Sequence, residues 1–266
     1  MTLIPNTAKQ RLGRGEITAG FSLRQSRTAD TGLIAKACGF HWLMIDLEHN
    51  AMDLDTAAQI GVAAMCAGIT PIVRVPGPEH WQATRLLDTG AQGIIFPHVD
   101  DAETAERVVS QCLFPPRGRR SLTGGLPQVS FGSSNYPAAE LVTHLNDNIL
   151  VVVMLETARA IAHADAIAAV PGVDVLLIGT NDLCADLGLT GQIGHETVAD
   201  AYRATVAAAK AHGKAAGMAG VYDQLLMTRY IAMGCRFVQA AVDLALIMQA
   251  GRERMEFLNG LLLRPS

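Results

Sequence analysis

Two apolar segments of the sequence each lead to an acidic residue. Residues 151–155 run into Glu156, and residues 175–178 continue through a Gly-Thr-Asn turn to Asp182. If both segments are neighbouring parallel strands, their carboxyl ends lie at one edge of the sheet, so the two carboxylates can meet around one cation. Carboxylate oxygens suit Mg²⁺ or Mn²⁺, which keep positions open for substrate oxygens. We therefore expect Glu156 and Asp182 to bind a divalent metal, with Mg²⁺, Mn²⁺ and Co²⁺ all open.

The turn between the second strand and the next helix offers a site for an anion. The backbone amides of the turn from Gly179 to Asp182, which opens a helix, would form a local anion site that suits a carboxylate. Asn181 and Asp182 also have a simpler interpretation, because either side chain could cap the short helix at 183–188. Both interpretations stay open at this point.

A third strand, residues 71–74, ends in an arginine. A guanidinium group stays ionised and makes two parallel hydrogen bonds, so Arg74 is suited to a substrate oxygen that becomes negative during a reaction. The alternative is a salt bridge to Asp46 or Glu48, which follow the neighbouring strand.

A histidine follows the strand at residues 42–46. His49 lies just beyond the end of this strand, and its free pKa near neutrality suits a group that carries protons in catalysis. The other seven histidines, among them His98, have no comparable position. Four strand ends thus outline a metal-assisted active site.

These side chains need a sheet that collects its strand ends on one face. Apolar runs alternate with helix-like sequence, and glycine turns such as KACGF and MCAGI precede several runs. This alternation predicts a (β/α)8 barrel, with a doubly wound open sheet as the lesser option. The predicted strands are residues 17–23, 42–46, 70–75, 93–96, 149–155, 175–178, 214–218 and 236–240.

One segment interrupts this rhythm. Residues 113–148 are rich in Gly, Pro, Ser and Asn, with a basic cluster at Arg117, Arg119 and Arg120. A long irregular insert in a compact domain is usually a lid or a subunit contact, and a plain surface excursion is the alternative. We expect residues 1–266 to form a single barrel domain that carries this insert.

The composition argues against several classes of protein. The chain has 266 residues and a formal net charge of −4, which gives no reason to expect a nucleic-acid partner. Its five scattered cysteines indicate free thiols rather than disulfides or a zinc site. No apolar run reaches the ~18 residues of a membrane span, and the start has no apolar core of signal-peptide length. We expect a cytoplasmic protein without a membrane partner.

At the site residues named above, the chain resembles the HpcH/HpaI family, the metal-dependent (class II) pyruvate aldolases of aromatic-acid catabolism. Members of this family include 4-hydroxy-2-oxo-heptanedioate aldolases. The resemblance spans nearly the whole chain and lies in the segments GFHWLMIDLEHNAMD, PIVRVPG, LLDTGAQGIIFPHVDDAETAE, PPRGRRS, MLETARA and AVPGVDVLLIGTNDLCADLG. It implies a (β/α)8 barrel of the phosphoenolpyruvate/pyruvate type, with the last helix exchanged between subunits and a homo-hexamer built as a trimer of dimers.

The resemblance also implies a role for each site residue. Glu156 and Asp182 would hold the metal, and Arg74 would contact the keto or enolate oxygen of the substrate. His49 would be the acid/base group in partnership with Asp88, a partnership that spacing alone does not suggest. The amides at Gly179, Asn181 and Asp182 would bind the pyruvate carboxylate.

The implied reaction is the cleavage of a 4-hydroxy-2-oxo acid to pyruvate, or hydroxypyruvate, and an aldehyde, together with its reverse. Many family members read GPADLS where this chain has GTNDLC, so Thr180, Asn181 and Cys184 are expected to alter the lining near the carboxylate. A citryl- or malyl-CoA-type lyase is the alternative enzyme, and a non-catalytic barrel scaffold is the alternative without activity. No lysine follows a predicted strand end, which argues against a Schiff-base aldolase.

Overall fold

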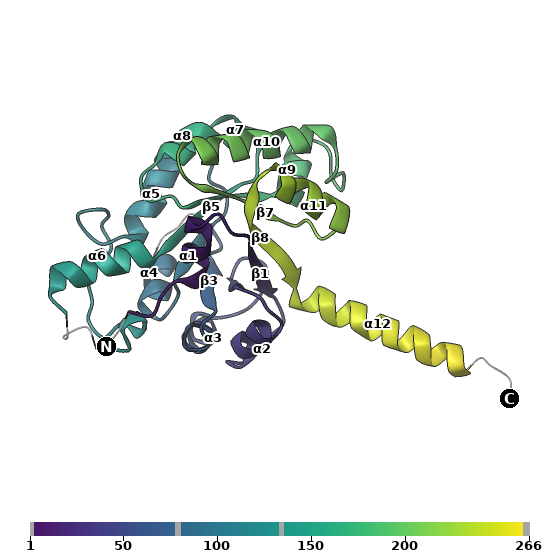
Figure 1. Ribbon diagram of the computed structural model, residues 1–266, viewed down its shortest axis with the longest axis horizontal. Helices are drawn as coiled ribbons and strands as arrows, with labels where there is room; N and C mark the ends of the chain where they lie inside the picture. The colour runs from purple at the N-terminus through teal and green to yellow at the C-terminus, as the bar shows by residue number, and fades with distance from the viewer. Residues whose placement is uncertain (1–2, 78–80, 133–135, 263–266) are drawn as a thin grey trace.

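Eight parallel strands close into a barrel in sequence order, with β1 beside β8 (Figure 1). The structure is a computed structural model that describes residues 3–77, 81–132 and 136–262. The predicted (β/α)8 barrel is confirmed, and the open sheet is wrong because β8 pairs with β1. The strands are β1 (Thr18–Leu23), β2 (Trp42–Asp46), β3 (Thr70–Arg74), β4 (Gly93–Phe96), β5 (Leu150–Leu155), β6 (Val175–Gly179), β7 (Ala215–Ala219) and β8 (Cys235–Val242).

Helices between the strands surround the barrel (Figure 1). Their starts and the turns that follow them have local causes: Asp101 accepts a hydrogen bond from the Thr104 amide, and Gly39 and Gly68 adopt positive φ angles in turns before β2 and β3. These helices are α2 (Thr31–Ala37), α3 (Leu54–Cys66), α4 (Trp81–Asp88), α5 (Ala102–Cys112), α7 (Ala158–Ala162), α8 (Ala164–Ala169), α9 (Thr180–Asp186), α10 (Glu196–Ala211) and α11 (Gln224–Met233).

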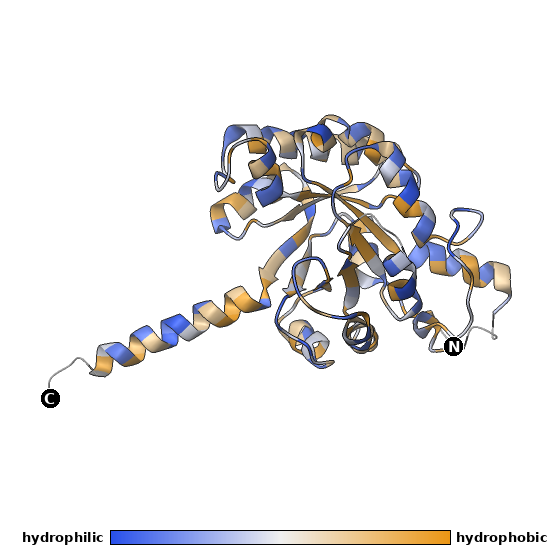
Figure 2. Ribbon diagram, turned by 180° about the vertical axis from the view of Figure 1, so that it is seen from behind, coloured by the Kyte–Doolittle hydropathy of each residue, from blue (hydrophilic) through white to orange (hydrophobic). Residues whose placement is uncertain are grey.

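The interior of the barrel is filled by apolar side chains, and Figure 2 shows the strands mostly in the hydrophobic colour. Trp42 and Phe237 stack there with ring centroids 4.1 Å apart. Gly20 makes room for this stack, because a Cβ at that position would lie 2.2 Å from the indole of Trp42. The short helix α1 (Thr7–Gly13) contributes the fully buried Ala8 to the same cluster. The interior is thus a packed core, and in barrels of this kind the chemistry lies at the carboxyl end of the strands.

The insert at residues 113–148 is only partly irregular. It contains the short 3-10 helix η1 (Pro127–Val129) and ends in the eleven-residue helix α6 (Ala138–Asn148). The overall composition of residues 113–148 predicts an irregular segment, but all of its glycines and prolines precede α6. Leu141 and Leu145 of α6 pack with Phe114 in a separate small core.

The last helix, α12 (Asp243–Leu262), extends away from the barrel (Figure 1). Several of its large apolar residues are more than a third exposed, among them Leu246, Ile247, Met255 and Phe257. The exchange of this helix between subunits stays a prediction. Within the described ranges, no helix has both the length and the apolar character needed to cross a membrane. The five cysteines are free thiols, as predicted.

Asp243, at the start of α12, fixes the loop after β1. Its carboxylate accepts hydrogen bonds from the backbone amides of Arg24 and Gln25 at 2.9 Å and of Ser26 and Leu244 at 2.7 Å. Burial alone would raise the pKa of Asp243, but these four N–H donors outweigh it and lower the pKa.

We expect the Asp243→Asn variant to be less stable by about 1–3 kcal/mol near neutral pH, because an amide cannot accept all four hydrogen bonds. A carboxylate with a lowered pKa stabilises the fold above its unfolded pKa and loses that effect as the pH falls through its folded pKa. The difference between wild type and variant should therefore narrow below about pH 4. Urea unfolding at several pH values measures this stability difference. Equal free energies of unfolding for wild type and variant at pH 7 would contradict the prediction.

Candidate active site

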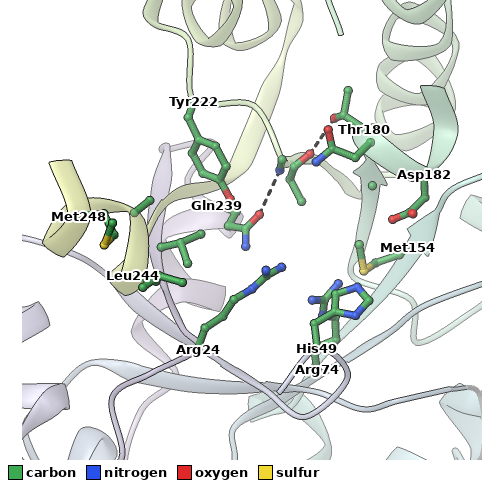
Figure 3. A pocket seen from close by; sticks show the side chains of 16 residues that line it. Arg24, His49, Arg74, Met154, Thr180, Asp182, Tyr222, Gln239, Leu244 and Met248 are labelled. Atoms are coloured by element: carbon green, nitrogen blue, oxygen red, sulfur yellow. Dashed lines mark hydrogen bonds between the residues drawn. The ribbon is translucent and has the colours of Figure 1, made fainter. Parts of the chain in front are cut away.

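A pocket of about 560 Å³ opens at the carboxyl end of the barrel (Figure 3). Its lining brings together residues from distant parts of the sequence, including five of the seven predicted site residues: His49, Arg74, Gly179, Asn181 and Asp182. Glu156, the sixth, lies directly against Gly179, whereas Asp88 is not part of the lining.

Glu156 is buried beside this pocket, at the end of β5. Its Oε2 accepts a hydrogen bond of 2.8 Å from the His98 amide, and a Cβ at Gly179 would lie 2.5 Å from its Oε1. Gly179 is thus what leaves room for this carboxylate. Burial raises the pKa of Glu156, and the nearby charges of Asp182 and Glu48 add to the rise, while the His98 amide and ring oppose it.

Asp182 lies in the first turn of α9 with an exposed side chain. The capping interpretation is wrong, because the N-cap of α9 is Gly179 and no side chain makes a capping hydrogen bond there. Asp182 therefore keeps its carboxylate available to a ligand, in the vicinity of Glu156.

The acidic side chains suit a dication that completes its coordination with other ligands. Glu48 and Asp182 lie close enough to Glu156 for their negative charges to oppose its ionisation. A bound cation would relieve this repulsion. In the part of the chain that the structure describes, no three Asp, Glu, His or Cys side chains are grouped to hold a metal by themselves. The donor set fits a hard cation held by two carboxylates, with substrate and water oxygens as its remaining ligands.

Arg74 makes the salt bridges of the alternative interpretation and still faces the pocket. Its Nε and Nη2 donate to the two carboxylate oxygens of Asp46 at 3.0 and 2.7 Å, and its Nη1 lies 2.8 Å from Glu48. Burial would raise the pKa of Asp46, but the hydrogen bonds and charge of Arg74 outweigh it and lower the pKa. Each terminal nitrogen of Arg74 retains a second N–H for a substrate oxygen.

His49 lies at the pocket with a half-exposed side chain, and its Nε2 is 3.7 Å from Glu48 Oε2. Asp88, at the end of α4, instead forms an ion pair of 2.6 Å with Arg120 of the insert. No contact joins Asp88 to His49 within the residues described here, so their partnership stays a prediction.

Two site residues, Glu48 and His98, were missed as functional candidates. The ring nitrogens of His98 lie 3.5 Å from Glu48 Oε1 and 3.3 Å from Glu156 Oε2, so His98 lies between the two acids. It adopts a φ of 56°, which is uncommon outside glycine and aims its amide at Glu156. Both residues come two positions after a strand end, and that shared position is a signal that could have revealed them.

Two of the three residues that were expected to alter the lining near the substrate carboxylate lie at the pocket. Thr180 and Asn181 belong to the pocket lining, but the Thr180 hydroxyl is engaged with the Tyr202 hydroxyl and the Ala219 carbonyl, both at 2.7 Å. Cys184 packs in the outer core and does not line the pocket.

Comparisons with known proteins agree with this fold. The profile of the HpcH/HpaI aldolase/citrate lyase family matches residues 25–250. The chain is 37% identical over 259 residues to the 4-hydroxy-4-methyl-2-oxoglutarate aldolase tasA of Hapsidospora irregularis, covering 95% of this chain and 94% of that protein. It is 36% identical to a hydroxypyruvate/pyruvate aldolase of Roseobacter denitrificans, covering 93% and 94%.

A crystal structure of an HpcH/HpaI aldolase from Desulfitobacterium hafniense DCB-2 superposes with a TM-score of 0.90, at 28% identity and 97% coverage of both chains. The resemblance found in the sequence is thus confirmed. The chain belongs to the HpcH/HpaI aldolase/citrate lyase family and is a carbon–carbon lyase of the aldolase kind.

Proposed function

We propose that the protein is a divalent-metal-dependent aldolase that cleaves and forms 4-hydroxy-2-oxo acids, with pyruvate or hydroxypyruvate as the donor. The observation that carries this proposal is the meeting of Asp182, Arg74 and His49 around one pocket, with Glu156 beside it. The names of the relatives support it, since they describe aldolases of 4-hydroxy-4-methyl-2-oxoglutarate and of hydroxypyruvate and pyruvate.

Carboxylates, an arginine and backbone amides of the pocket would together bind the 2-oxo acid and stabilise its enolate. Glu156 and Asp182 would hold Mg²⁺, Mn²⁺ or Co²⁺, which supplies Lewis-acid polarisation of a 2-oxo acid. Arg74, held by Asp46, directs its remaining N–H groups at the 2-oxo oxygen, where negative charge accumulates. The amides of Gly179, Asn181 and Asp182 face the substrate carboxylate at the start of α9.

The proton transfers fall to His49. In cleavage it takes the proton of the C4 hydroxyl, the C3–C4 bond breaks, and the bonding electrons pass to C3 as the enolate forms. C4 leaves as a carbonyl compound, and C3 then gains a proton to give the methyl group of pyruvate. In synthesis the same steps run in reverse. Half-exposed at the mouth of the pocket, His49 can exchange its proton with water.

Several further predictions belong to this proposal. Asp88 would assist His49, and the protein would act in the cytoplasm as a homo-hexamer with exchanged α12 helices. The exposed apolar residues of α12 support a subunit contact. Its partners would be small molecules rather than nucleic acid or membranes.

The CoA-lyase alternative is less well supported, because two arginines of the basic cluster are already paired. Arg120 is buried and paired with Asp88, and Arg117 lies 2.5 Å from Asp147. Little free positive charge is left there for the phosphates of a carrier.

The test is enolisation of pyruvate in deuterated water with added Mg²⁺, Mn²⁺ or Co²⁺. We expect metal-dependent loss of the methyl proton signal, and release of pyruvate from 4-hydroxy-2-oxo acids. Activity on citryl- or malyl-CoA, without exchange of pyruvate protons, would favour the lyase instead. A protein that keeps its fold but shows neither activity would contradict the proposal.

A further inference from the structure

The pocket contains a second cation that the proposed mechanism does not use. Arg24, just after β1, extends its guanidinium into the pocket (Figure 3). Its Nε is buried and lies 3.7 Å from Asp46 Oδ2, too far for a hydrogen bond, while that oxygen is already bound by Arg74 at 2.7 Å. Burying an N–H donor without a partner is costly, so an absent acceptor is indicated.

Two further donors face the same part of the pocket. Gln239 is only 6% exposed; its Oε1 accepts from the Gly220 amide at 3.1 Å, and its Nε2 has only the weak acceptor Met44 Sδ at 3.9 Å among the described residues. Partial burial raises the pKa of Tyr222 to about 12, with Arg24 and Arg74 opposing the rise, so its hydroxyl stays protonated. Figure 3 shows both side chains above the guanidinium of Arg24.

This corner of the pocket is fixed by the fold. The four backbone hydrogen bonds of Asp243 include the amide of Arg24 itself, and they hold the loop that carries it. Leu244 and Met248, from the first turns of α12, form an apolar wall of the same pocket. A positive charge with two neutral donors, partly shielded by apolar side chains, is a site for one carboxylate.

We propose that Arg24, with the Gln239 amide and the Tyr222 hydroxyl, binds a second carboxylate of the substrate, attached directly to C4. This inference rests on the proposed function and names its substrate class: 4-carboxy-4-hydroxy-2-oxo acids, whose carbonyl product is a 2-oxo acid. Arg24 Nε and Arg74 Nη2 lie 3.7 and 2.7 Å from the same oxygen of Asp46, so the two guanidinium groups are neighbours in the pocket. A carboxylate on C4 lies close to the oxygen at C2 and suits two neighbouring cations better than a carboxylate at the end of a longer chain.

Two substrates that both release pyruvate separate this inference from the proposed function. 4-Hydroxy-4-methyl-2-oxoglutarate carries a carboxylate on C4 and yields two molecules of pyruvate, while 4-hydroxy-2-oxopentanoate has none and yields pyruvate and acetaldehyde. We expect wild type to prefer the first in kcat/KM. The Arg24→Met variant should lose about 10- to 100-fold on the first substrate and little on the second. The matched control is Arg107→Met, on the exposed face of α5, which should change neither.

A second variant tests the site without removing Arg24. Gln239→Glu keeps an oxygen for the Gly220 amide but places a negative charge beside the second carboxylate, so it should also lower activity on the dicarboxylate selectively. Equal losses on both substrates, or no loss in either variant, would overturn the inference. Exchange of pyruvate methyl protons is measured in every variant: if wild type exchanges them but shows no preference for the C4 carboxylate, only this inference fails. If wild type lacks exchange as well, the proposed function fails.

Discussion

Replacing Glu156 by glutamine, or Asp182 by asparagine, is expected to lower metal-dependent cleavage by at least about 1000-fold, the loss of several kcal/mol of Lewis-acid stabilisation. Neither change alters the shape of the side chain, and both remove a charge that a dication needs. In the metal-free protein, Glu156→Gln should leave the fold intact or stabilise it, because burial and the charges of Asp182 and Glu48 already disfavour the carboxylate.

The measurements are pyruvate release with saturating Mn²⁺, and thermal unfolding with and without the metal. Wild type should gain stability from Mn²⁺, and the two variants should gain much less. Glu103→Gln, on the surface of α5, is the control for the loss of one carboxylate. Full activity in either variant, with an unchanged response to Mn²⁺, would refute the assignment of the metal ligands.

Loss of Arg74 should slow enolisation of pyruvate by about 100- to 1000-fold, the effect of removing one donor to a developing oxyanion. A single Arg74→Met change leaves the fully buried Asp46 without the guanidinium group that binds both of its oxygens. The free energy of unfolding should fall by about 3–5 kcal/mol, which is enough to unfold a marginally stable protein. The informative protein is therefore the double variant Arg74→Met with Asp46→Asn, compared with Asp46→Asn alone.

Exchange of the pyruvate methyl protons in deuterated water reports this step without any acceptor. We expect exchange to persist in the Asp46→Asn variant and to be lost in the double variant, with circular dichroism showing both folded. Persistent exchange in the folded double variant would show that Arg74 does not stabilise the enolate.

Most of the fold is determined by local features that a sequence displays. All eight strands lie within a few residues of their predicted bounds, since each is a buried apolar run that follows a turn. Glycines with positive φ, such as Gly39 and Gly68, mark those turns. The helix α6 was missed because its helical sequence follows a stretch dominated by glycine, proline and serine.

Only those site residues that lie at or just after strand ends could be predicted from the sequence. The barrel rule brings Glu156, Asp182, Arg74 and His49 to one face, and the structure places all four at or beside one pocket. Contacts between side chains are not visible in this way. The position of His98 between two acids depends on an uncommon backbone angle that no pattern announces.

Arg24 and Gln239 show the same limit from the other side of the pocket. Arg24 follows β1 and Gln239 lies in β8, but the sequence around them does not show that their side chains carry unpaired donors. The feature that matters is the distance of Arg24 from Asp46, which depends on the pairing of β1 with β2, where Leu23 lies opposite Ile45. Such distances depend on strand register and side-chain conformation, which the sequence alone does not display.

A crystal structure with Mn²⁺ and pyruvate would show whether Glu156 and Asp182 hold the metal, because anomalous scattering locates Mn²⁺ independently of the protein atoms. We expect one Mn²⁺ peak within coordination distance of the carboxylates of Glu156 and Asp182, with both the carboxylate and the 2-oxo oxygen of pyruvate bound to it. A fully occupied peak elsewhere, with neither carboxylate in contact with the metal, would contradict it.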